Sequence, residues 1–580
     1  TGTINMSGVP ENADVVAAFL YWETIAHVGV GPRDIANSVK FRGEPIKSVR
    51  VKSTKQPLAA SCFLSGGPWE ITMFRADVKR LLPPQLDING KSIGKLLVND
   101  EDLLENNLPL HKVTLPTGSL VSDSAGASLV VVYRDRSMPL KKVVLYDGLH
   151  VAPLAEETTQ GIAGFYQSGG VPKKARLTHI VGSSASNSTD ALWFNNVKIK
   201  TNPFQGTASL SDRAWSDVTV DVSLLMPLAT VSPVYGETVT SKVTHGSNSP
   251  YECLTYEATL FSVTVPDADK DGIPDRLEQP GNVLKDPNNV ELPNFYAMGA
   301  RLLRRDFFAE VNALKTTAPT TYGSATAPYD SGVGPDLIPG TADDTPYVES
   351  VVAPPHNHMP IARVLTDVGV AMKAAPLVNL DGTTGIWAHF DVGNVAAYHA
   401  LGADYSPGVG TNDEYLVPTA YAKGGEITEE TACDEMDPTC RFPDYPGTVG
   451  WAFSLTQHML DKFDQNRNGL VHYLLYAHTR GKPRNLCVNE DGSPDLNCEA
   501  TNPDFHVAWS SSGVSALPGD RAIISLGRWD DFVGKPFMVS STTLHEIGHQ
   551  WELYHGGPRP TFIEIPGIDD GTEWASKKVF

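Results

Sequence analysis

Short apolar runs separated by turn residues fill the first 265 residues, and this pattern restricts the possible folds more than any other feature. Runs rich in Val, Leu, Tyr and Phe recur at 15–22, 128–133 and 142–146, with Gly, Pro, Asn and Ser between them. Such spacing is typical of strands in all-β proteins. It predicts a β-sandwich or jelly-roll region made of two packed units, at residues 1–120 and 121–265.

From about residue 290 the pattern changes to alternating helices and strands. Within 361–375, five apolar residues fall on one helical face: Ile361, Val364, Leu365, Val368 and Met372. Strands are expected at 305–314, 385–392, 470–478 and 521–527, and a further helix at 449–463. This order predicts an α/β domain over residues 290–580, in which a twisted sheet is backed by helices and the last helix lies beneath one edge.

Length and charge narrow the possible partners. The 580 residues are enough for roughly three to four domains or subdomains. The formal net charge of −21 argues against nucleic acid, because a phosphate backbone binds a basic surface, and it favours divalent cations. No run reaches the roughly 20 apolar residues that a membrane-spanning helix needs. Thr1 is not an initiator Met and no leader-like segment follows it, so we expect a processed or trimmed start.

The six cysteines suggest disulfide bonds. Four of them form two close pairs in polar, turn-rich segments, namely Cys433 with Cys440 and Cys487 with Cys498. Two short bridges would leave Cys62 and Cys253 to join the two ends of the N-terminal region. Buried free thiols or a thiolate metal site are the alternatives, although no Cys-x-x-Cys spacing occurs. Disulfides predict a secreted or cell-surface protein outside a reducing cytosol.

A twelve-residue acidic loop, DADKDGIPDRLE, follows the β-rich region. Calcium requires six to eight oxygens, and side chains at positions 1, 3, 5, 9 and 12 with a carbonyl at position 7 supply them. These positions hold Asp267, Asp269, Asp271, Asp275 and Glu278, with the carbonyl of Ile273. The loop resembles the calcium loops of EF-hands and thrombospondin type 3 repeats. We expect a calcium-binding linker at residues 266–280 that stiffens the junction; the alternative is a solvated acidic linker.

Residues 541–557 read STTLHEIGHQWELYHGG and carry the clearest chemistry in the chain. His545 and His549 are four residues apart, so on a helix they share one face and can bind a single zinc ion. Glu546 follows the first histidine, where its carboxylate can act as general base toward a zinc-bound water. Thr543 and Glu546 also fit a capping box, so Glu546 could instead close the start of a helix.

The spacing His-x3-His-x5-His resembles the zinc motif of metzincin-like domains in large secreted bacterial proteins. The resemblance implies His555 as third ligand and covers residues 290–557, including RRDFFAEVNAL, NLDGTTGIWAHFDVG and RNGLVHYLLYAH. A continuous helix, rising about 1.5 Å per residue, would carry His555 away from the metal, so the helix must end first. Metzincins place a Gly where this chain has Glu552. They also have a Met turn after the third ligand, yet the last methionine is Met538, so we expect a chain cut short at Phe580.

Other side chains are alternative ligands. Glu564 or Glu573 could replace His555 as the third zinc ligand, as in gluzincins. His356 and His358 form an HNH pair in a predicted loop and could bind a metal adventitiously. Three further histidines lie on predicted strands and are expected to be core residues or to surround a site: His389, His472 and His478.

The metzincin resemblance implies a zinc-dependent endopeptidase that acts on a protein or peptide substrate. Glu546 would serve as base and then as proton donor to the leaving amine. The N-terminal β-rich region would provide anchoring, self-assembly or substrate-binding contacts. The alternative is an extracellular structural or adhesive calcium-binding protein with a vestigial protease domain. Glu552 and the missing Met turn favour that alternative, whereas the intact Glu546 disfavours it.

Overall fold

The computed structural model divides into two compact units, and each is described by itself. The first comprises residues 1–82, 100–268 and 272–294, and the second comprises 83–99, 269–271 and 295–580. The structure describes the chain apart from scattered shorter gaps and these runs: 28–38, 57–68, 83–103, 116–123, 167–173, 206–213, 228–236, 246–253, 323–350, 402–412, 431–454, 484–505 and 559–580. All six cysteines lie outside the described residues, and so do the predicted disulfides.

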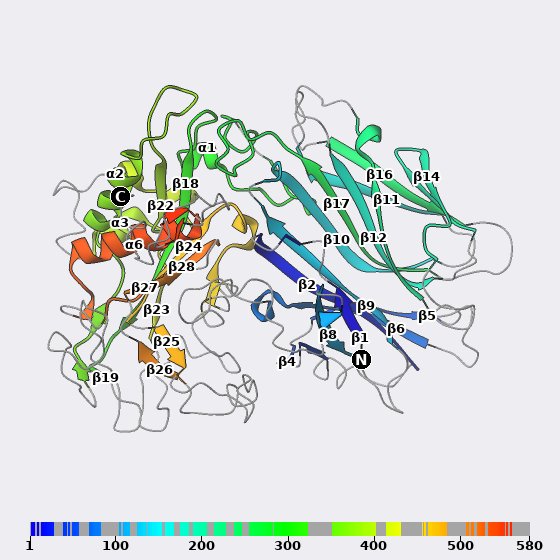
Figure 1. Ribbon diagram of the computed structural model, residues 1–580, viewed down its shortest axis with the longest axis horizontal. Coiled ribbons are helices and arrows are strands. Elements are labelled where there is room, and N and C mark those ends of the chain that lie inside the picture. Colours follow the sequence, from blue (N-terminus) through cyan, green and yellow to red (C-terminus); the bar gives the residue numbers. More distant parts are fainter. Residues whose placement is uncertain are drawn as a thin grey trace, which may run out of the picture. The chain divides into compact units, whose positions relative to one another are not determined.

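In the described part of the first unit the strands form four antiparallel sheets (Figure 1). Two of these sheets have the orders β1-β8-β3-β4, with β7 beside β8, and β5-β6-β2-β9. Their strands are β1 (Gly2–Asn5), β2 (Asp14–His27), β3 (Lys40–Phe41), β4 (Glu44–Pro45), β5 (Val49–Gln56), β6 (Trp69–Asp77), β7 (Leu104–Glu105), β8 (Leu108–Thr114) and β9 (Ser124–Arg134). Strand β9 begins after residue 120 and pairs with β2, so this sheet extends past the predicted boundary.

The other two sheets have the orders β10-β17-β12-β15 and β11-β16-β13-β14. Their strands are β10 (Lys141–Val151), β11 (Thr158–Phe165), β12 (Ala175–Ser184), β13 (Ala191–Phe194), β14 (Val197–Thr201), β15 (Ala214–Asp221), β16 (Glu237–Thr244) and β17 (Thr255–Thr264). Figure 1 shows β10, β17 and β12 side by side. Two 3-10 helices, η2 (Lys79–Leu81) and η4 (Ser223–Leu225), complete the elements of this unit.

Strand β2 explains how these sheets form one compact unit. Leu20 and Trp22 pack with Phe74 in one core. Tyr21, on the opposite face of the strand, packs with Ile180 of β12 in a second core. Successive side chains of a strand point to opposite faces, so β2 is buried on both sides. A third core, between the sheets of β12 and β13, contains Phe165, Phe194 and Phe261.

A seven-stranded sheet organises the described part of the second unit, with the order β21-β18-β24-β28-β27 and with β22 and β23 also beside β18. The central strand β18 (Asp306–Thr316) is parallel to three neighbours: β22 (Trp387–Asp391), β23 (Ile427–Glu429) and β24 (His472–Tyr476). Strand β28 (Arg521–Ile524) is parallel to β24. The outer strands β21 (His356–Asn357) and β27 (Gly513–Ser515) are antiparallel to their neighbours.

Two helices, α2 (Ala362–Lys373) and α6 (Pro536–Gln550), pack on one face of this sheet (Figure 1). Val368 of α2 and Ile547 of α6 share a core with Val311 of β18 and Leu474 of β24. The remaining elements are α1 (Phe295–Met298), α3 (Val395–His399), η6 (Asp413–Tyr415), η7 (Thr419–Tyr421), η8 (Gln465–Arg467), β19 (Thr320–Tyr322), β20 (Val351–Ala353), β25 (Arg480–Pro483), β26 (His506–Trp509), β29 (Leu553–Tyr554) and β30 (Gly557–Pro558).

The predicted β-rich, multidomain organisation is confirmed, and so is the element order after residue 290. The strands predicted at 305–314, 385–392, 470–478 and 521–527 are β18, β22, β24 and β28. The helix predicted at 361–375 is α2. In the segment predicted as a helix at 449–463, the described residues Leu455, His458, Met459 and Lys462 are helical.

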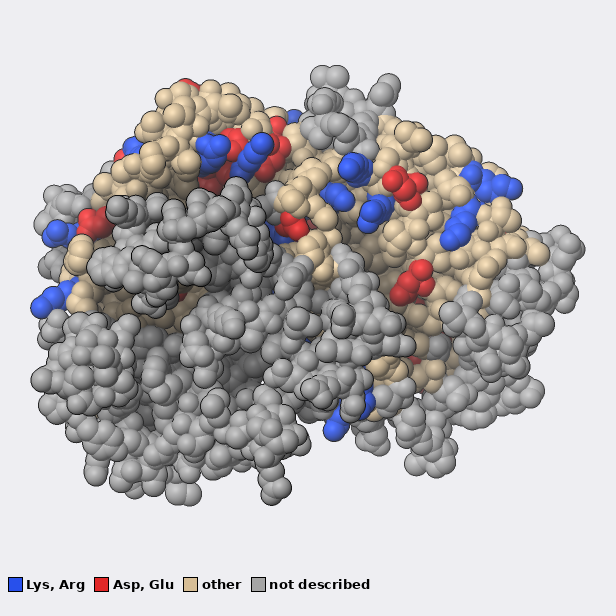
Figure 2. All heavy atoms as spheres, in the orientation of Figure 1, with Lys and Arg blue, Asp and Glu red and all other residues tan. Residues whose placement is uncertain are grey.

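Surface charges of the described residues are mixed. Figure 2 shows lysine and arginine side chains in small groups on this face, interspersed with acidic ones. Among the helices of the described residues, none is long and apolar enough to cross a lipid bilayer.

Candidate functional site

The predicted zinc motif lies in the second half of helix α6. The helix begins at Pro536, where a missing N–H costs nothing because the first helical N–H groups have no partner within the helix. Thr543 is therefore in the middle of the helix, and its hydroxyl donates to the carbonyl of Val539 at 2.7 Å. The alternative interpretation, in which Thr543 and Glu546 cap a helix start, is wrong for this reason.

His545 and His549 lie next to each other on one face of α6. Their ring centroids are 4.6 Å apart and the ring planes are at 81°. His545 is exposed and His549 is half-buried. His549 Nδ1 donates to the carbonyl of Leu553 at 2.7 Å. That hydrogen bond leaves the lone pair on Nε2, which is the form of imidazole that binds a metal.

The side chain of Glu546 lies at the edge of the sheet. Its side chain is buried, with 3% of the residue exposed. The carboxylate lies against Gly513 of β27, because a Cβ added to that glycine would lie 2.7 Å from Glu546 Oε1. The edge strand therefore fixes the position of the predicted general base relative to the two histidines.

The chain bends where the third ligand requires it to bend. Helix α6 ends at Gln550, and Trp551 follows with φ −92° and ψ 15°. Strands β29 and β30 then form a hairpin in which Tyr554 pairs with Gly557. His555 and Glu552 lie outside the described residues, as do the alternative ligands Glu564 and Glu573. The structure therefore brings together two of the three predicted zinc ligands and the predicted base.

Contacts at both ends of β24 hold the helix in place. Tyr476 Oη and Thr543 Oγ1 are 3.0 Å apart, and His472 Nδ1 donates to Gln550 Oε1 at 2.6 Å. His472 therefore supports the last turn of the motif helix.

The acidic loop has the geometry of an oxygen cage. Carboxylate oxygens of Asp267, Asp269 and Asp271 lie within 4.8 Å of one another. Gly272 has φ of 93°, and its N–H donates to Asp267 Oδ2 at 3.0 Å. A positive φ is costly for other residue types, so Gly272 provides the sharp turn that the spacing predicted.

Two of the later positions of the loop are buried. Ile273 and Glu278 are 3% and 1% exposed, respectively. Asp275 Oδ1 accepts from the N–H of Ala268 at 2.7 Å, and burial raises the pKa of the Asp275 carboxyl.

Asp306 was not predicted as a site residue. Its Oδ1 accepts from His389 Nε2 at 2.7 Å and from Arg304 Nη2 at 2.9 Å. Its main-chain N–H donates to Asp271 Oδ2 at 2.9 Å. The sequence contains one indication that Asp306 could take part in a site: it is an acidic residue at the start of a strand and directly follows two arginines. His389 is thus buried beside Asp306.

Comparisons with known proteins give no family for this chain. No protein-family model and no curated protein matches the sequence. Dimeric latent PorU from Porphyromonas gingivalis is similar over 45% of this chain and 22% of its own, with 10% identity and a TM-score of 0.16. A family two carbohydrate esterase from Cellvibrio japonicus is similar over 72% of this chain and 98% of its own, with 13% identity and a TM-score of 0.12. Neither similarity is close enough to indicate a fold or an activity.

Proposed function

We propose that the second unit is a metzincin-like catalytic domain and that the protein is an extracytoplasmic zinc-dependent endopeptidase. The observation that carries the proposal is the arrangement on α6, where two neighbouring imidazoles flank a buried carboxylate at a sheet edge. This combination suits a site that binds a metal and moves a proton, because the imidazoles supply ligands and the carboxylate supplies a base.

The donor atoms suit zinc. Imidazole nitrogen is among the preferred ligands of Zn²⁺, and an acceptor such as the Leu553 carbonyl fixes the tautomer of His549. The bend after Gln550 allows His555 to return to the metal as third ligand. When bound, zinc lowers the pKa of a water molecule and polarises a substrate carbonyl.

Glu546 performs the proton transfers in the proposed reaction. Its carboxylate accepts a proton from the water as the water oxygen bonds to the peptide carbonyl carbon. It then delivers that proton to the amide nitrogen as the carbon–nitrogen bond breaks, which releases an acid and an amine. Gly513 leaves room for the carboxylate at this edge of the sheet, because an added Cβ would lie 2.7 Å from Oε1.

We also propose that the acidic loop at residues 266–280 binds calcium. The proposal is supported by the convergence of Asp267, Asp269 and Asp271 and by the positive φ of Gly272. Bound calcium would neutralise carboxylates that otherwise repel one another at this spacing. The remaining predicted ligands are the carbonyl of Ile273 and the carboxylates of Asp275 and Glu278.

Hydrolysis of an unfolded protein substrate tests the endopeptidase proposal. Purified chain should cleave the substrate, lose activity on treatment with a zinc chelator and regain it with added Zn²⁺. Glu546→Gln should lower the rate roughly 100- to 10,000-fold while zinc content stays the same. Glu157→Gln is the matched control, because that side chain is exposed in the first unit, where it pairs with Lys242.

Stoichiometric zinc without any cleavage would overturn the proposal and support the structural or adhesive alternative. The same conclusion would follow if Glu546→Gln left the cleavage rate unchanged.

A further inference from the structure

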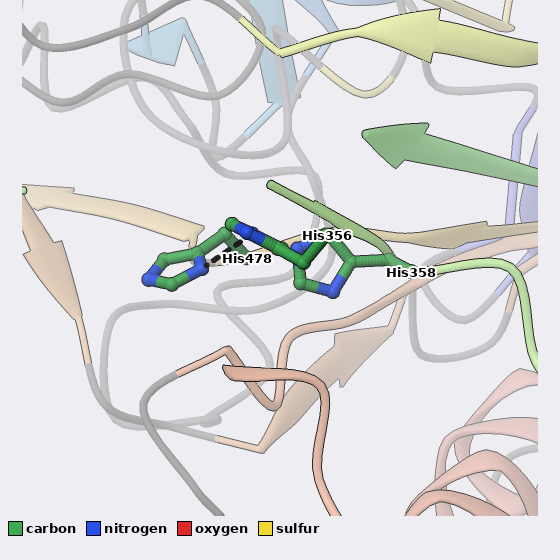
Figure 3. A group of neighbouring side chains, drawn as sticks. All are labelled: His356, His358 and His478. Carbon is green, nitrogen blue, oxygen red and sulfur yellow. Dashed lines mark hydrogen bonds between the residues drawn. The ribbon is translucent and has the colours of Figure 1, made fainter. Parts of the chain in front are cut away.

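Three histidines outside the zinc motif meet at one place in the second unit. His356 lies in β21, His358 follows two residues later, and His478 lies just beyond β24. One ring nitrogen from each lies within 4.8 Å of the other two. Figure 3 shows the three imidazoles grouped together, with His356 between the other two and joined to His478 by a hydrogen bond.

The nitrogen positions match those of ligands around one metal ion. His356 Nε2 and His478 Nδ1 are 3.3 Å apart. Two nitrogens bound to zinc at about 2.05 Å in a tetrahedron are separated by roughly the same 3.3 Å. His356 Nδ1 lies 2.7 Å from the carbonyl of Pro354, to which it can donate. That hydrogen bond leaves Nε2 as the atom with the lone pair, aimed at His478.

A carboxylate lies beside one member of the group. His358 Nε2 is 3.7 Å from Glu430 Oε2, and both residues are buried, with 6% and 8% exposed. Strand β18 positions both of them, because the N–H of His358 donates to Leu314 O at 2.9 Å and that of Glu430 donates to Lys315 O at 2.7 Å.

The walls of the cluster restrict movement of the histidines. A Cβ added to Gly527 would lie 2.3 Å from His478 Nδ1, so the ring occupies space that only a glycine leaves open. The ring of Phe532 stacks on His478, with centroids 6.3 Å apart, and lies 6.2 Å from the ring of His356. Because the histidine side chains are already held in place before a metal binds, metal binding costs little side-chain conformational entropy.

We propose that His356, His358 and His478 form a second metal site that takes a borderline divalent ion, foremost Zn²⁺. Three imidazole nitrogens fill three positions of a tetrahedron. The ion would join the segments that follow β20 and β24.

This site is separate from the zinc motif of α6. Tyr476, near the end of β24, contacts Thr543, whereas His472, at the start of the strand, contacts Gln550. His545 and His549 lie in the last turns of the helix, toward the His472 end. His478 lies beyond Tyr476, at the opposite end of β24. The two sites can therefore be emptied independently by substitution.

Zinc analysis of the full chain in the His545→Ala/His549→Ala background tests the proposal, whether or not the chain is a protease. After removal of all metal and dialysis against Zn²⁺, this variant should retain one zinc per chain. Adding His356→Asn and His358→Asn should remove that zinc and also abolish the rise in Tm on zinc addition. The control substitution His150→Asn, at an exposed histidine of the first unit, should leave the zinc content at one.

Cobalt keeps the test decisive if the fourfold variant does not fold. Co²⁺ added to the metal-free His545→Ala/His549→Ala variant should give the intense visible absorption of four-coordinate cobalt at one equivalent. The proposal would be overturned if the His545→Ala/His549→Ala variant bound no zinc. It would also be overturned if zinc remained bound after His356 and His358 were replaced, or if the cobalt spectrum were that of a six-coordinate ion.

Discussion

The carboxylate of Glu546 lies directly against Gly513, since a Cβ on this glycine would be 2.7 Å from Oε1 and 2.9 Å from Cγ of the glutamate. A methyl group at position 513 must therefore displace the predicted base of the reaction. Strand β27 is the last strand on this side of the described sheet, so the strand and the base form one structural unit.

Gly513→Ala should lower kcat/KM for a peptide substrate about 100-fold, because a shift of about 1 Å in a catalytic group can cost that much. Zinc content should not change, since the three atoms nearest to the added Cβ belong to Glu546 and Thr542 rather than to either histidine. Steady-state kinetics with zinc analysis measure both effects. Gly161→Ala is the control, because nothing lies within 4 Å of its added Cβ. Full activity in Gly513→Ala would contradict the placement of the base.

Calcium should stabilise the chain through the acidic loop. Asp269 is 2% exposed and its carboxylate belongs to the group with Asp267 and Asp271. A ligand present at 100 times its Kd stabilises the folded state by about 2.7 kcal/mol. Calcium titration during calorimetry should therefore raise the Tm of the unmodified chain and have a much smaller effect on Asp269→Asn. Asp367→Asn, at an exposed position of α2, should respond like the unmodified chain. An equal calcium response in Asp269→Asn would exclude the loop as the binding site.

Local patterns in the sequence predicted the elements of the second unit and the acidic loop. The helical spacing of Val364, Leu365 and Val368 predicted α2, and the same residues pack in the core. The loop could be predicted because its ligands are contiguous, so that spacing alone brings Asp267, Asp269 and Asp271 together.

Contacts between distant segments could not be predicted from such patterns. His478 is 122 residues from His356, and His389 is 83 residues from Asp306. Strand pairing decides these contacts, because β24 and β21 both pair with β18. From the sequence, His478 could only be predicted to be a histidine on a strand. Its proximity to His356 and His358 follows from the fold.

A buried acid on β18 should make stability depend on pH. Desolvation raises the pKa of Glu310 from 4.5 to about 7. The folded chain then holds a proton that the unfolded chain releases between pH 4.5 and 7, so stability falls as the pH rises through that window. A tenfold difference in proton affinity is worth about 1.4 kcal/mol, which gives an upper limit of about 3 kcal/mol for the loss. Urea unfolding at pH 5 and pH 8 should show a smaller difference for Glu310→Gln than for the unmodified chain. Glu157→Gln should keep the full difference.

Arg467 should be among the most important single side chains for the stability of the second unit. It is 2% exposed, and Nη1 donates to Asp391 Oδ2 at 2.5 Å and to Glu310 Oε2 at 3.4 Å. Arg467→Met would leave two carboxylates buried without their cation, which costs about 3–5 kcal/mol.

Urea unfolding measures the loss in Arg467→Met, and two comparisons identify its cause. Lys462→Met removes only a partly exposed ion pair with Glu426, so it should cost less than about 1 kcal/mol. In a Glu310→Gln/Asp391→Asn background both buried carboxylate charges are gone, and the cost of Arg467→Met should fall by more than half, because the penalty comes from the carboxylates that lose their partner. An unchanged cost in that background would mean that the arginine stabilises the fold through packing rather than through charge.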